Sequence, residues 1–278
     1  MLSLTVSELE AKQSRLEAEL RTVPSMVVAY SGGVDSAFLA YAAHKVLADR
    51  MLAVTALSES YSADDRRKAT DCAQQLALPH EFIETREIAN RAYRANAPNR
   101  CFFCKDELFN ELDALAARRG YAAVAYGVNL DDLGDWRPGQ QAAREHRVLT
   151  PLVAAGLTKS DIRELARLAG VPVWDRPASP CLASRIAYGV EVTPERLRVV
   201  EQGESALRAL GFTRFRLRHH DKLARVEIAP EELPRALDPA MARRFVEILK
   251  ALGFTYVTLD LEGYRQGSLN SGLTKIAM

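Results

Sequence analysis

Residues 26–36 read Met-Val-Val-Ala-Tyr-Ser-Gly-Gly-Val-Asp-Ser, and this stretch decides the fold. Its first half, Met26–Tyr30, is a short apolar run typical of a buried strand, and a helix is expected over about 36–48. The glycines between them let the backbone turn sharply and approach a ligand closely. The start of the helix adds unpaired N–H groups and the positive end of a dipole. The stretch therefore predicts a strand–loop–helix unit that holds phosphate oxygens.

The expected phosphate-binding residues of this loop are Ser31, Gly32, Gly33, Asp35 and Ser36. Asp35 would be repelled by phosphate unless Mg²⁺ lies between them. The loop has no lysine, so it differs from the Gly-x-x-x-x-Gly-Lys type. The alternative interpretation is a glycine-rich turn with a helix cap, since Asp and Ser are ordinary caps. The strand before the loop and the helix after it favour the phosphate interpretation.

Strand and helix patterns alternate through the chain on both sides of this loop. Further strands are predicted over residues 51–57, 80–84 and 121–126, and helices over 63–77, 101–119 and 159–169. Such alternation is typical of a parallel sheet with helices on both faces. We therefore predict an α/β fold, a doubly wound parallel sheet, for a first domain over residues 1–185.

The pattern changes after about residue 186. Two predicted helices, 194–210 and about 239–251, both run into Leu-Gly-Phe-Thr, and a strand follows each of them. Another strand is predicted over 223–229, and coincidence is the alternative to a true repeat. We predict a second, smaller α+β domain over residues 186–278, which binds substrate or forms an oligomer contact.

The composition of the chain excludes several classes of protein. Its 278 residues are 48% apolar and 26% charged, which is ordinary for a soluble globular protein. The formal net charge of +1 gives no basic excess, so no nucleic-acid partner is expected. No run approaches the about 18 apolar residues of a membrane span. The N-terminus lacks a secretory pattern and there are four cysteines, so a cytoplasmic location with reduced thiols is expected.

Three of the cysteines lie in settings that suggest chemistry. Cys101 and Cys104 are three residues apart at a predicted helix start, where the dipole favours thiolate. Cys181 lies in a proline-rich loop beside an arginine, which suggests a nucleophile or a metal ligand. Three cysteines can ligate a [4Fe–4S] cluster and leave one iron open. The alternatives are a redox pair, structural thiols, or zinc with a histidine as fourth ligand, from His219 or His220; the spacing alone does not decide between them.

The phosphate loop resembles the PP-loop of the ATP pyrophosphatase superfamily, over roughly residues 25–175. Members such as GMP synthetases, NAD synthetases and tRNA thiolation enzymes cleave ATP between the α and β phosphates and adenylate their substrate. The resemblance implies that Gly127, after the fourth strand, lines the adenine pocket.

Three further strings resemble one family, LarE, over nearly the whole chain. They are Pro-Cys-Leu-Ala-Ser-Arg at 180–185, Asn-Leu-Asp-Asp-Leu-Gly-Asp at 129–135 followed by Arg-Pro-Gly at 137–139, and Leu-Asp-Leu-Glu-Gly-Tyr-Arg-Gln-Gly-Ser at 259–268. LarE enzymes are ATP-dependent sulfur transferases in the synthesis of the nickel-pincer nucleotide cofactor. The resemblance implies that carboxylates of pyridinium-3,5-biscarboxylic acid mononucleotide become thiocarboxylates, with release of AMP and pyrophosphate.

The resemblance implies two sources for the transferred sulfur. In the best-known mode Cys181 attacks the adenylate, and cleavage of its Cβ–S bond leaves dehydroalanine and sulfur on the substrate. Members of that type lack Cys101 and Cys104. This sequence resembles the subgroup in which three cysteines hold a [4Fe–4S] cluster that carries an extra sulfide, and we favour that mode.

Several charged residues are given roles by their place in the sequence and by the charge of the substrate. Lys105 and Arg185 are expected to neutralise phosphate or adenylate charge, and together with Cys181 and Asp35 they form the predicted catalytic set. Arg218 and Arg265 are expected to hold the phosphate and carboxylates of the substrate. The alternative for each arginine and lysine is a surface charge.

Three acidic residues have less specific expectations. Glu204 resembles a family position near a metal or substrate site, although a glutamate in mid-helix is usually only solvated. Asp131 and Asp135 are expected to bind Mg²⁺ or to shape the nucleotide loop.

Other functions remain open at this point. A PP-loop tRNA thiolation enzyme is the main alternative, which the neutral charge and the lack of a paired zinc-ribbon set disfavour. A catalytically idle nucleotide sensor and an ammonia-using synthetase are further alternatives. The resemblance also suggests a homo-oligomer, and a sulfide-delivery partner is left open.

Overall fold

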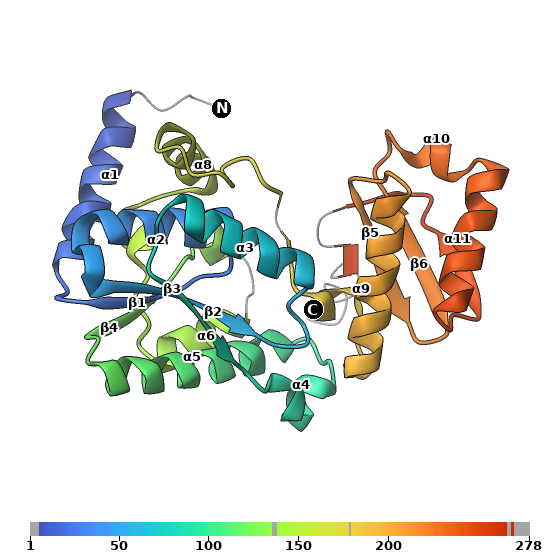
Figure 1. The fold of residues 1–278 in the computed structure, drawn as a ribbon, viewed down its shortest axis with the longest axis horizontal. Coiled ribbons are helices and arrows are strands. Elements are labelled where there is room, and N and C mark those ends of the chain that lie inside the picture. Colours follow the sequence, from blue (N-terminus) through green and yellow to red (C-terminus); the bar gives the residue numbers. More distant parts are fainter. Residues whose placement is uncertain (1–5, 135–137, 178, 266–267, 270–278) are drawn as a thin grey trace. The chain divides into compact units, whose positions relative to one another are not determined.

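The computed structural model describes residues 6–134, 138–177, 179–265 and 268–269 (Figure 1). They form two compact units. The first unit comprises the chain up to Glu87 together with Cys101–Ser179, and the second comprises Ile88–Arg100 together with the chain from Pro180. Within the described ranges, no helix is long and apolar enough to span a membrane.

The first unit is built on four parallel strands in the order β3-β2-β1-β4. Their bounds are β1 Met26–Ala29, β2 Met51–Leu57, β3 His80–Glu84 and β4 Ala123–Tyr126. In the register, Met26 of β1 pairs with Met51 on one side and with Ala123 on the other. The chain order reverses between β1 and β4, and ligands of open α/β sheets bind at the carboxyl ends of strands beside such a reversal.

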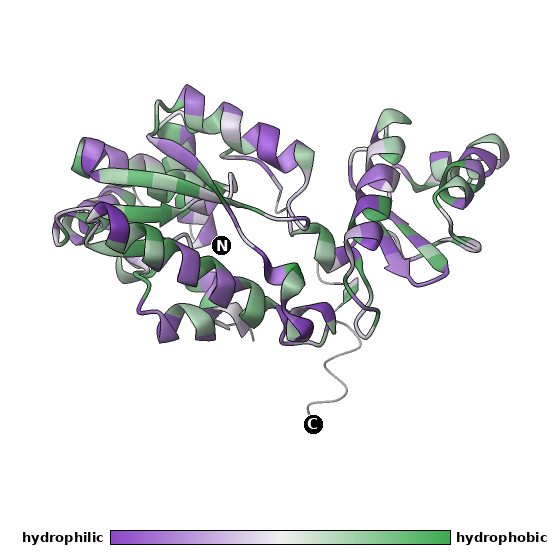
Figure 2. Cartoon of the chain, turned by 60° about the horizontal axis from the view of Figure 1, so that its bottom comes forward, coloured by the Kyte–Doolittle hydropathy of each residue, from purple (hydrophilic) through white to green (hydrophobic). Residues whose placement is uncertain are grey.

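Helices cover both faces of this sheet, which confirms the predicted doubly wound α/β fold (Figure 1). On one face, buried side chains of α1 (Val6–Arg21), α2 (Val34–Leu47), α3 (Ala63–Gln75) and α8 (Lys159–Leu168) share a core with Val28 and Ala53. On the other face, α5 (Arg100–Arg119) and α6 (Pro138–Glu145) share a core with Val27 and Leu52. Alternate residues of a strand therefore serve opposite layers, as the pleat requires. Figure 2 shows the helices banded with hydrophilic and hydrophobic residues, whereas the central strands are mostly hydrophobic.

Short elements connect these layers. They are η1 Ala48–Arg50, η2 Glu87–Ala89, η3 Leu130–Gly134 and α7 Pro151–Ala154. The N-terminus of α8 carries a complete capping box, in which the side chains of Thr158 and Asp161 each accept the other's backbone N–H. This cap fixes where α8 begins, and with it the position of Lys159.

The second unit is a smaller mixed sheet with two long helices. β5 (Phe215–His220) is antiparallel to β6 (Leu223–Ile228), which is parallel to β7 (Tyr256–Leu259). Each long helix, α9 (Pro194–Ala209) and α11 (Pro239–Ala251), ends just before a glycine with positive φ, and a strand follows. The predicted helix–glycine–strand pattern therefore occurs twice. The shorter elements are α4 Arg91–Arg94, η4 Leu182–Arg185 and α10 Leu233–Ala236.

Residues 88–100 join the second unit although they precede α5 in the chain. The buried Asn96 explains this, because its side-chain amide donates to the carbonyl oxygens of Ala187 and Val190, both at 2.8 Å. These bonds satisfy backbone groups that would otherwise be buried without partners. The functional division predicted at 185/186 stays a prediction.

Candidate active site

The phosphate loop, residues 30–36, joins β1 to α2 as predicted. The hydroxyl of Ser36 accepts from the N–H of Ser31 (3.1 Å) and donates to the carbonyl of Gly33 (3.0 Å). The two serine hydroxyls lie 3.1 Å apart. Among the described residues, no side chain caps α2 at Gly33, so the first N–H groups of this helix can serve an anion.

Two glycines allow close backbone approach at this loop. Gly32 has φ +71°, and a Cβ there would lie 2.7 Å from Cβ of Ala69 on α3. Gly127, directly after β4, packs against the start of α2, so that a Cβ would lie 2.7 Å from the backbone nitrogen of Ser36. Both positions therefore exclude any side chain. The predicted contact of Gly127 with adenine stays a prediction. A glycine is required at position 127 in any case, because the backbone of the phosphate loop leaves no room for a Cβ there.

Asp35 lies in the first turn of α2 and is paired with a lysine that the sequence analysis missed. Its Oδ2 accepts from Nζ of Lys159 at 2.6 Å. Burial raises the pKa of Asp35, and the nearby Lys159 ammonium opposes that shift. Lys159 also donates its backbone N–H to Asp131 at 2.8 Å, which ties η3 to the start of α8. The sequence signal that could have identified Lys159 is its place at the start of a capped helix in the same α/β domain.

The arrangement around Asp35 fits Mg²⁺. In the described part of the chain, Oδ1 of Asp35 is buried without a hydrogen-bond partner. Mg²⁺ is usually held by one or two carboxylates plus substrate phosphates, and it keeps several waters. Asp35 would hold the ion against phosphates bound at the start of α2. Asp131 uses one oxygen on Lys159, and Asp135 lies outside the described residues.

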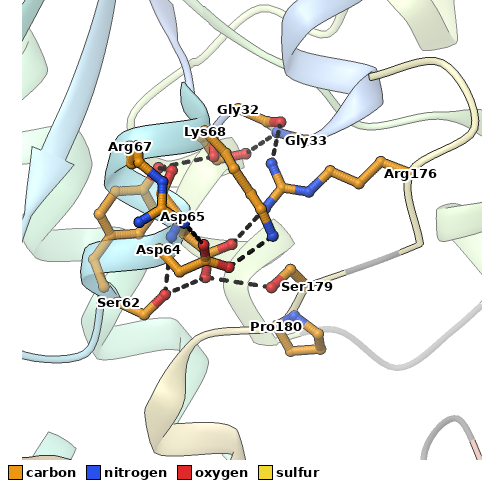
Figure 3. Close-up of polar contacts among 12 residues, drawn as sticks. Gly32, Gly33, Ser62, Asp64, Asp65, Arg67, Lys68, Arg176, Ser179 and Pro180 are labelled. Carbon is orange, nitrogen blue, oxygen red and sulfur yellow. Dashed lines mark hydrogen bonds and ion pairs between the residues drawn. The ribbon is translucent and has the colours of Figure 1, made fainter. Parts of the chain in front are cut away.

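A second ion pair lies beside Gly32 of the phosphate loop (Figure 3). Nη2 of Arg176 donates to Oδ1 of Asp65 at 2.7 Å, and its Nη1 donates to the carbonyl of Gly32 at 3.4 Å. Both side chains of this pair are 17% exposed. The sequence analysis did not predict this ion pair, because the two residues are 111 positions apart.

The predicted thiols Cys101 and Cys104 lie in the first turns of α5, in the first unit. Cys101 is exposed and Cys104 is half-buried. Nζ of Lys105 lies over the rings of Phe109 (5.7 Å) and Tyr126 (5.9 Å). Because Tyr126 ends β4, the charge of Lys105 lies toward the carboxyl end of the sheet. Its predicted catalytic role stays a prediction.

Cys181 lies in the second unit, directly before η4, and is half-buried. The loop that carries it is held by Arg185, whose Nη1 donates to the carbonyls of Pro180 and Cys181 (3.1 Å for the latter). Arg185 also forms a two-bond ion pair with Glu204 of α9, at 3.0 and 3.2 Å. The side chains are only 4% and 7% exposed. The geometry therefore makes Arg185 a residue that positions the Cys181 loop, and its predicted contact with phosphate or adenylate stays untested.

The two predicted substrate arginines differ in their surroundings. Arg218 is buried and donates to Glu227 (2.9 Å), to the hydroxyl of Ser268 (2.9 Å) and to a backbone carbonyl of η4. Its Nε is buried without a partner among the described residues. Arg265 forms an exposed ion pair with Glu262. Arg218 thus has an unused donor within the second unit, whereas Arg265 is in a surface setting.

The predicted [4Fe–4S] cluster needs three thiols close together. In the ranges that the structure describes, no three His, Cys, Asp or Glu side chains are arranged to hold a metal ion. Cys101 and Cys104 belong to the first unit and Cys181 to the second. The arrangement within each unit therefore does not form the cluster site, and we derive no chemical step through a cluster.

Comparisons with known proteins agree with this architecture. Residues 9–131 match the NAD synthase family. The chain is 43% identical over 267 residues to an uncharacterized protein of Synechocystis, which covers 96% of this chain and 100% of the relative. It is 34% identical over 271 residues to the pyridinium-3,5-bisthiocarboxylic acid mononucleotide synthase of Lactiplantibacillus plantarum, covering 97% and 98% of the two chains. It is also 32% identical over 219 residues to a tRNA-specific 2-thiouridylase of Azorhizobium caulinodans, covering 65% and 55%.

Proposed function

The chain belongs to the LarE family of PP-loop ATP-dependent sulfurtransferases, and from this premise we propose that it makes thiocarboxylates from pyridinium-3,5-biscarboxylic acid mononucleotide. The product would serve the synthesis of a nickel-pincer nucleotide cofactor. The relative from Lactiplantibacillus plantarum, matched over almost its whole length, supports this choice of substrate.

The first step is adenylation of a substrate carboxylate. A carboxylate is a poor electrophile because its oxygen is a poor leaving group, and transfer of AMP to that oxygen makes it a good one. The carboxylate oxygen attacks the α-phosphorus of ATP, and pyrophosphate leaves. The start of α2 and the hydroxyls of Ser31 and Ser36 would bind the phosphates, and Asp35 would hold Mg²⁺, which neutralises the developing charge.

The second step delivers sulfur. The thiolate of Cys181 attacks the acyl carbon of the adenylate, and AMP leaves with the electron pair of the broken C–O bond. Removal of the Cα proton of Cys181 then breaks its Cβ–S bond. The sulfur stays on the substrate as a thiocarboxylate, and dehydroalanine remains in the chain, so each chain delivers one sulfur.

One observation carries this assignment: the chain that leads to Cys181 is bound to the phosphate loop. Arg176 contacts Gly32, and the hydroxyl of Ser179 donates to Asp65 at 3.3 Å. Cys181 follows Ser179 by two residues, which span at most about 7 Å when fully extended. This tether supports a nucleophile that works on a nucleotide held at the phosphate loop.

The remaining assignments are parts of the same proposal. Lys105 would neutralise adenylate charge, and Arg218 and Arg265 would bind the substrate's anionic groups. The proposal also includes assembly of the chain into a homo-oligomer and a partner protein that delivers sulfide.

The sacrificial route proposed here is tested against the cluster alternative by a separate measurement. The cluster alternative requires Cys101 and Cys104, whereas the sacrificial route requires only Cys181. Iron, acid-labile sulfide and the visible spectrum are measured after anaerobic purification. Iron in stoichiometric amount, lost in Cys101→Ala together with repeated turnover, would establish the cluster route. Near-zero iron, with sulfur transfer intact in Cys101→Ala and loss of the mass of H₂S from each chain, would establish the sacrificial route.

The function is tested by offering two substrates to the purified protein. With ATP, Mg²⁺ and the biscarboxylic acid mononucleotide, we expect pyrophosphate, AMP and a thiocarboxylate product by mass spectrometry. Asp35→Ala should abolish all three products. The similarity to a tRNA-specific 2-thiouridylase makes bulk tRNA the second substrate to test. Thiolation of tRNA without reaction of the mononucleotide would refute the proposal and favour a tRNA thiolation enzyme.

A further inference from the structure

The carboxylate of Asp65, in the first turn of α3, accepts hydrogen bonds from three side chains (Figure 3). Its Oδ1 accepts from Arg176 at 2.7 Å. Its Oδ2 accepts from the hydroxyls of Ser62 (2.7 Å) and Ser179 (3.3 Å). Ser62 is the N-cap of α3 and also accepts the backbone N–H of Asp65, so the carboxylate is held in one orientation by its own helix.

Two of these partners belong to a segment that we call the strap, residues 174–177 and 179. The strap follows α8 and leads directly to Pro180 and Cys181. Apart from Asp65, it is held by Arg163 of α8, which donates to the carbonyls of Trp174 (2.9 Å) and Arg176 (2.8 Å). Arg176 in turn donates to the carbonyl of Gly32 in the phosphate loop. Asp65 thus fastens the last part of the strap, and Arg163 fastens its first part.

The length of free chain before Cys181 depends on this fastening. With Ser179 bound to Asp65, two Cα–Cα steps lead from the last fastened residue of the first unit to Cys181, and they reach at most about 7 Å. Without Asp65, the last fastened point among the described residues of the first unit is the carbonyl of Arg176, five residues before Cys181, and the reach grows to about 17 Å. Removal of one carboxylate would therefore more than double the free length of the tether.

We propose that Asp65 is a positioning residue for sulfur delivery: it fastens the strap to the start of α3, where Arg176 also contacts the phosphate loop, and so restricts Cys181 to the neighbourhood of the bound nucleotide. This inference rests on the proposed function, and Asp65 itself contacts no reacting atom. It predicts that Asp65 matters for the second step and not for the first. A reacting group that is misplaced by about 1 Å can lose on the order of 10²-fold in rate.

The neighbouring residue provides a matched control. Asp64 lies in the same turn of α3, and its carboxylate forms ion pairs with Arg67 and Lys68 of the same helix. Asp64→Asn and Asp65→Asn therefore make the same chemical change, one residue apart, and of these two carboxylates only that of Asp65 holds the strap in the contacts between described residues. Asp65→Glu keeps the carboxylate and serves as the rescue variant, and circular dichroism checks that each variant is folded.

The experiment separates the two steps in single turnovers. The pyrophosphate burst reports adenylation, and thiocarboxylate formation reports sulfur delivery. In Asp65→Asn we expect an unchanged pyrophosphate burst and thiocarboxylate formation slower by on the order of 10²-fold. Asp64→Asn should match the wild type in both, and Asp65→Glu should recover part of the second step. If pyrophosphate and thiocarboxylate fall together in Asp65→Asn, the residue serves the nucleotide site and the proposal is overturned.

A second readout needs neither ATP nor substrate. The rate at which iodoacetamide alkylates Cys181, measured on the digested peptide, should rise in Asp65→Asn and stay unchanged in Asp64→Asn. If the wild type makes no pyrophosphate at all, the proposed function fails, and the alkylation rates still test the fastening of the strap. Equal alkylation rates in the two variants would overturn the proposal whatever the activity. If Asp65→Asn does not fold, Ser179→Ala replaces it under the same expectations, because it removes the hydroxyl that binds Asp65 and leaves Arg176 on Gly32.

Discussion

The ion pair between Arg185 and Glu204 offers the sharpest prediction about stability. Both side chains are almost fully buried, at 4% and 7% exposure, and two hydrogen bonds of 3.0 and 3.2 Å join them. Glu204→Gln keeps the shape but removes the carboxylate charge that faces the buried guanidinium. Breaking a buried pair from one side costs about 3–5 kcal/mol. The second unit should therefore lose at least about 3 kcal/mol of its free energy of unfolding.

Native-state hydrogen exchange measures this loss, because it follows each unit separately. A loss of about 3 kcal/mol corresponds to exchange that is faster by on the order of 10²-fold for the protected amides of α9 and β5. Amides of the first unit should be unaffected. The control is Asp221→Asn, which removes the more exposed partner of Arg196 at 2.9 Å in the same unit. That pair should be worth less than about 1 kcal/mol. If both variants change the exchange rates equally, the pair contributes no more than a surface contact and our reasoning about Arg185 is wrong.

Three further predictions concern the first unit. Gly127→Ala should abolish nucleotide binding measured by calorimetry, because its Cβ would lie 2.7 Å from the backbone of α2, whereas Gly134→Ala, with open space around it, should bind normally. Burial raises the pKa of Asp35, and the Lys159 ammonium opposes this shift. Lys159→Met should therefore raise the pKa of Asp35 further and move the acid limb of the pH profile of pyrophosphate formation to higher pH. An acid limb at the same pH as in the wild type would contradict this pairing. Burial opposes protonation of His146, but hydrogen bonds to two carboxylates of α5 outweigh it and raise the pKa above 6.5. The contribution of His146 to the free energy of unfolding should be complete below about pH 6.5 and lost as the pH rises through the folded-state pKa. In His146→Gln, the free energy of unfolding measured with urea at several pH values should depend less on pH.

Local patterns in the sequence were enough to predict the α/β domain. The strands 51–57 and 80–84 have the predicted bounds. The first is a short apolar run that is mostly buried, as is typical of a parallel strand, whereas the second, His-Glu-Phe-Ile-Glu, is half-buried at the edge of the sheet. The phosphate loop was equally readable, since its glycines and serines are consecutive in the chain. The helices expected over 63–77 and 159–169 end at Gln75 and Leu168, within two residues of the prediction.

The features that the sequence did not predict all depend on distant partners. The segment 88–100 was left in the first domain because Asn96 acquires its meaning only from carbonyls about 90 positions later. Lys159 and Arg176 reach their partners across 124 and 111 positions. For Arg185 the charge and its place beside Cys181 could be read from the sequence. It could not show that Glu204 already neutralises that charge.

Cys181 is fastened on both sides by charged residues that act on its backbone neighbours. Before it, Asp65 holds Ser179 in the first unit. After it, Arg185 binds the carbonyl of Cys181 itself in the second unit, with Glu204 behind it. A thiol that attacks a bound adenylate needs one defined approach, and a proline-rich loop without regular structure does not supply it alone. The two fastenings make separate predictions, since loss of Asp65 should slow sulfur delivery without unfolding, whereas loss of Glu204 should loosen the second unit as well. The double variant Asp65→Asn, Glu204→Gln distinguishes the two fastenings. If it slows sulfur delivery only as much as Asp65→Asn alone, the strap dominates. If the two fold-changes multiply, each side restrains Cys181 independently.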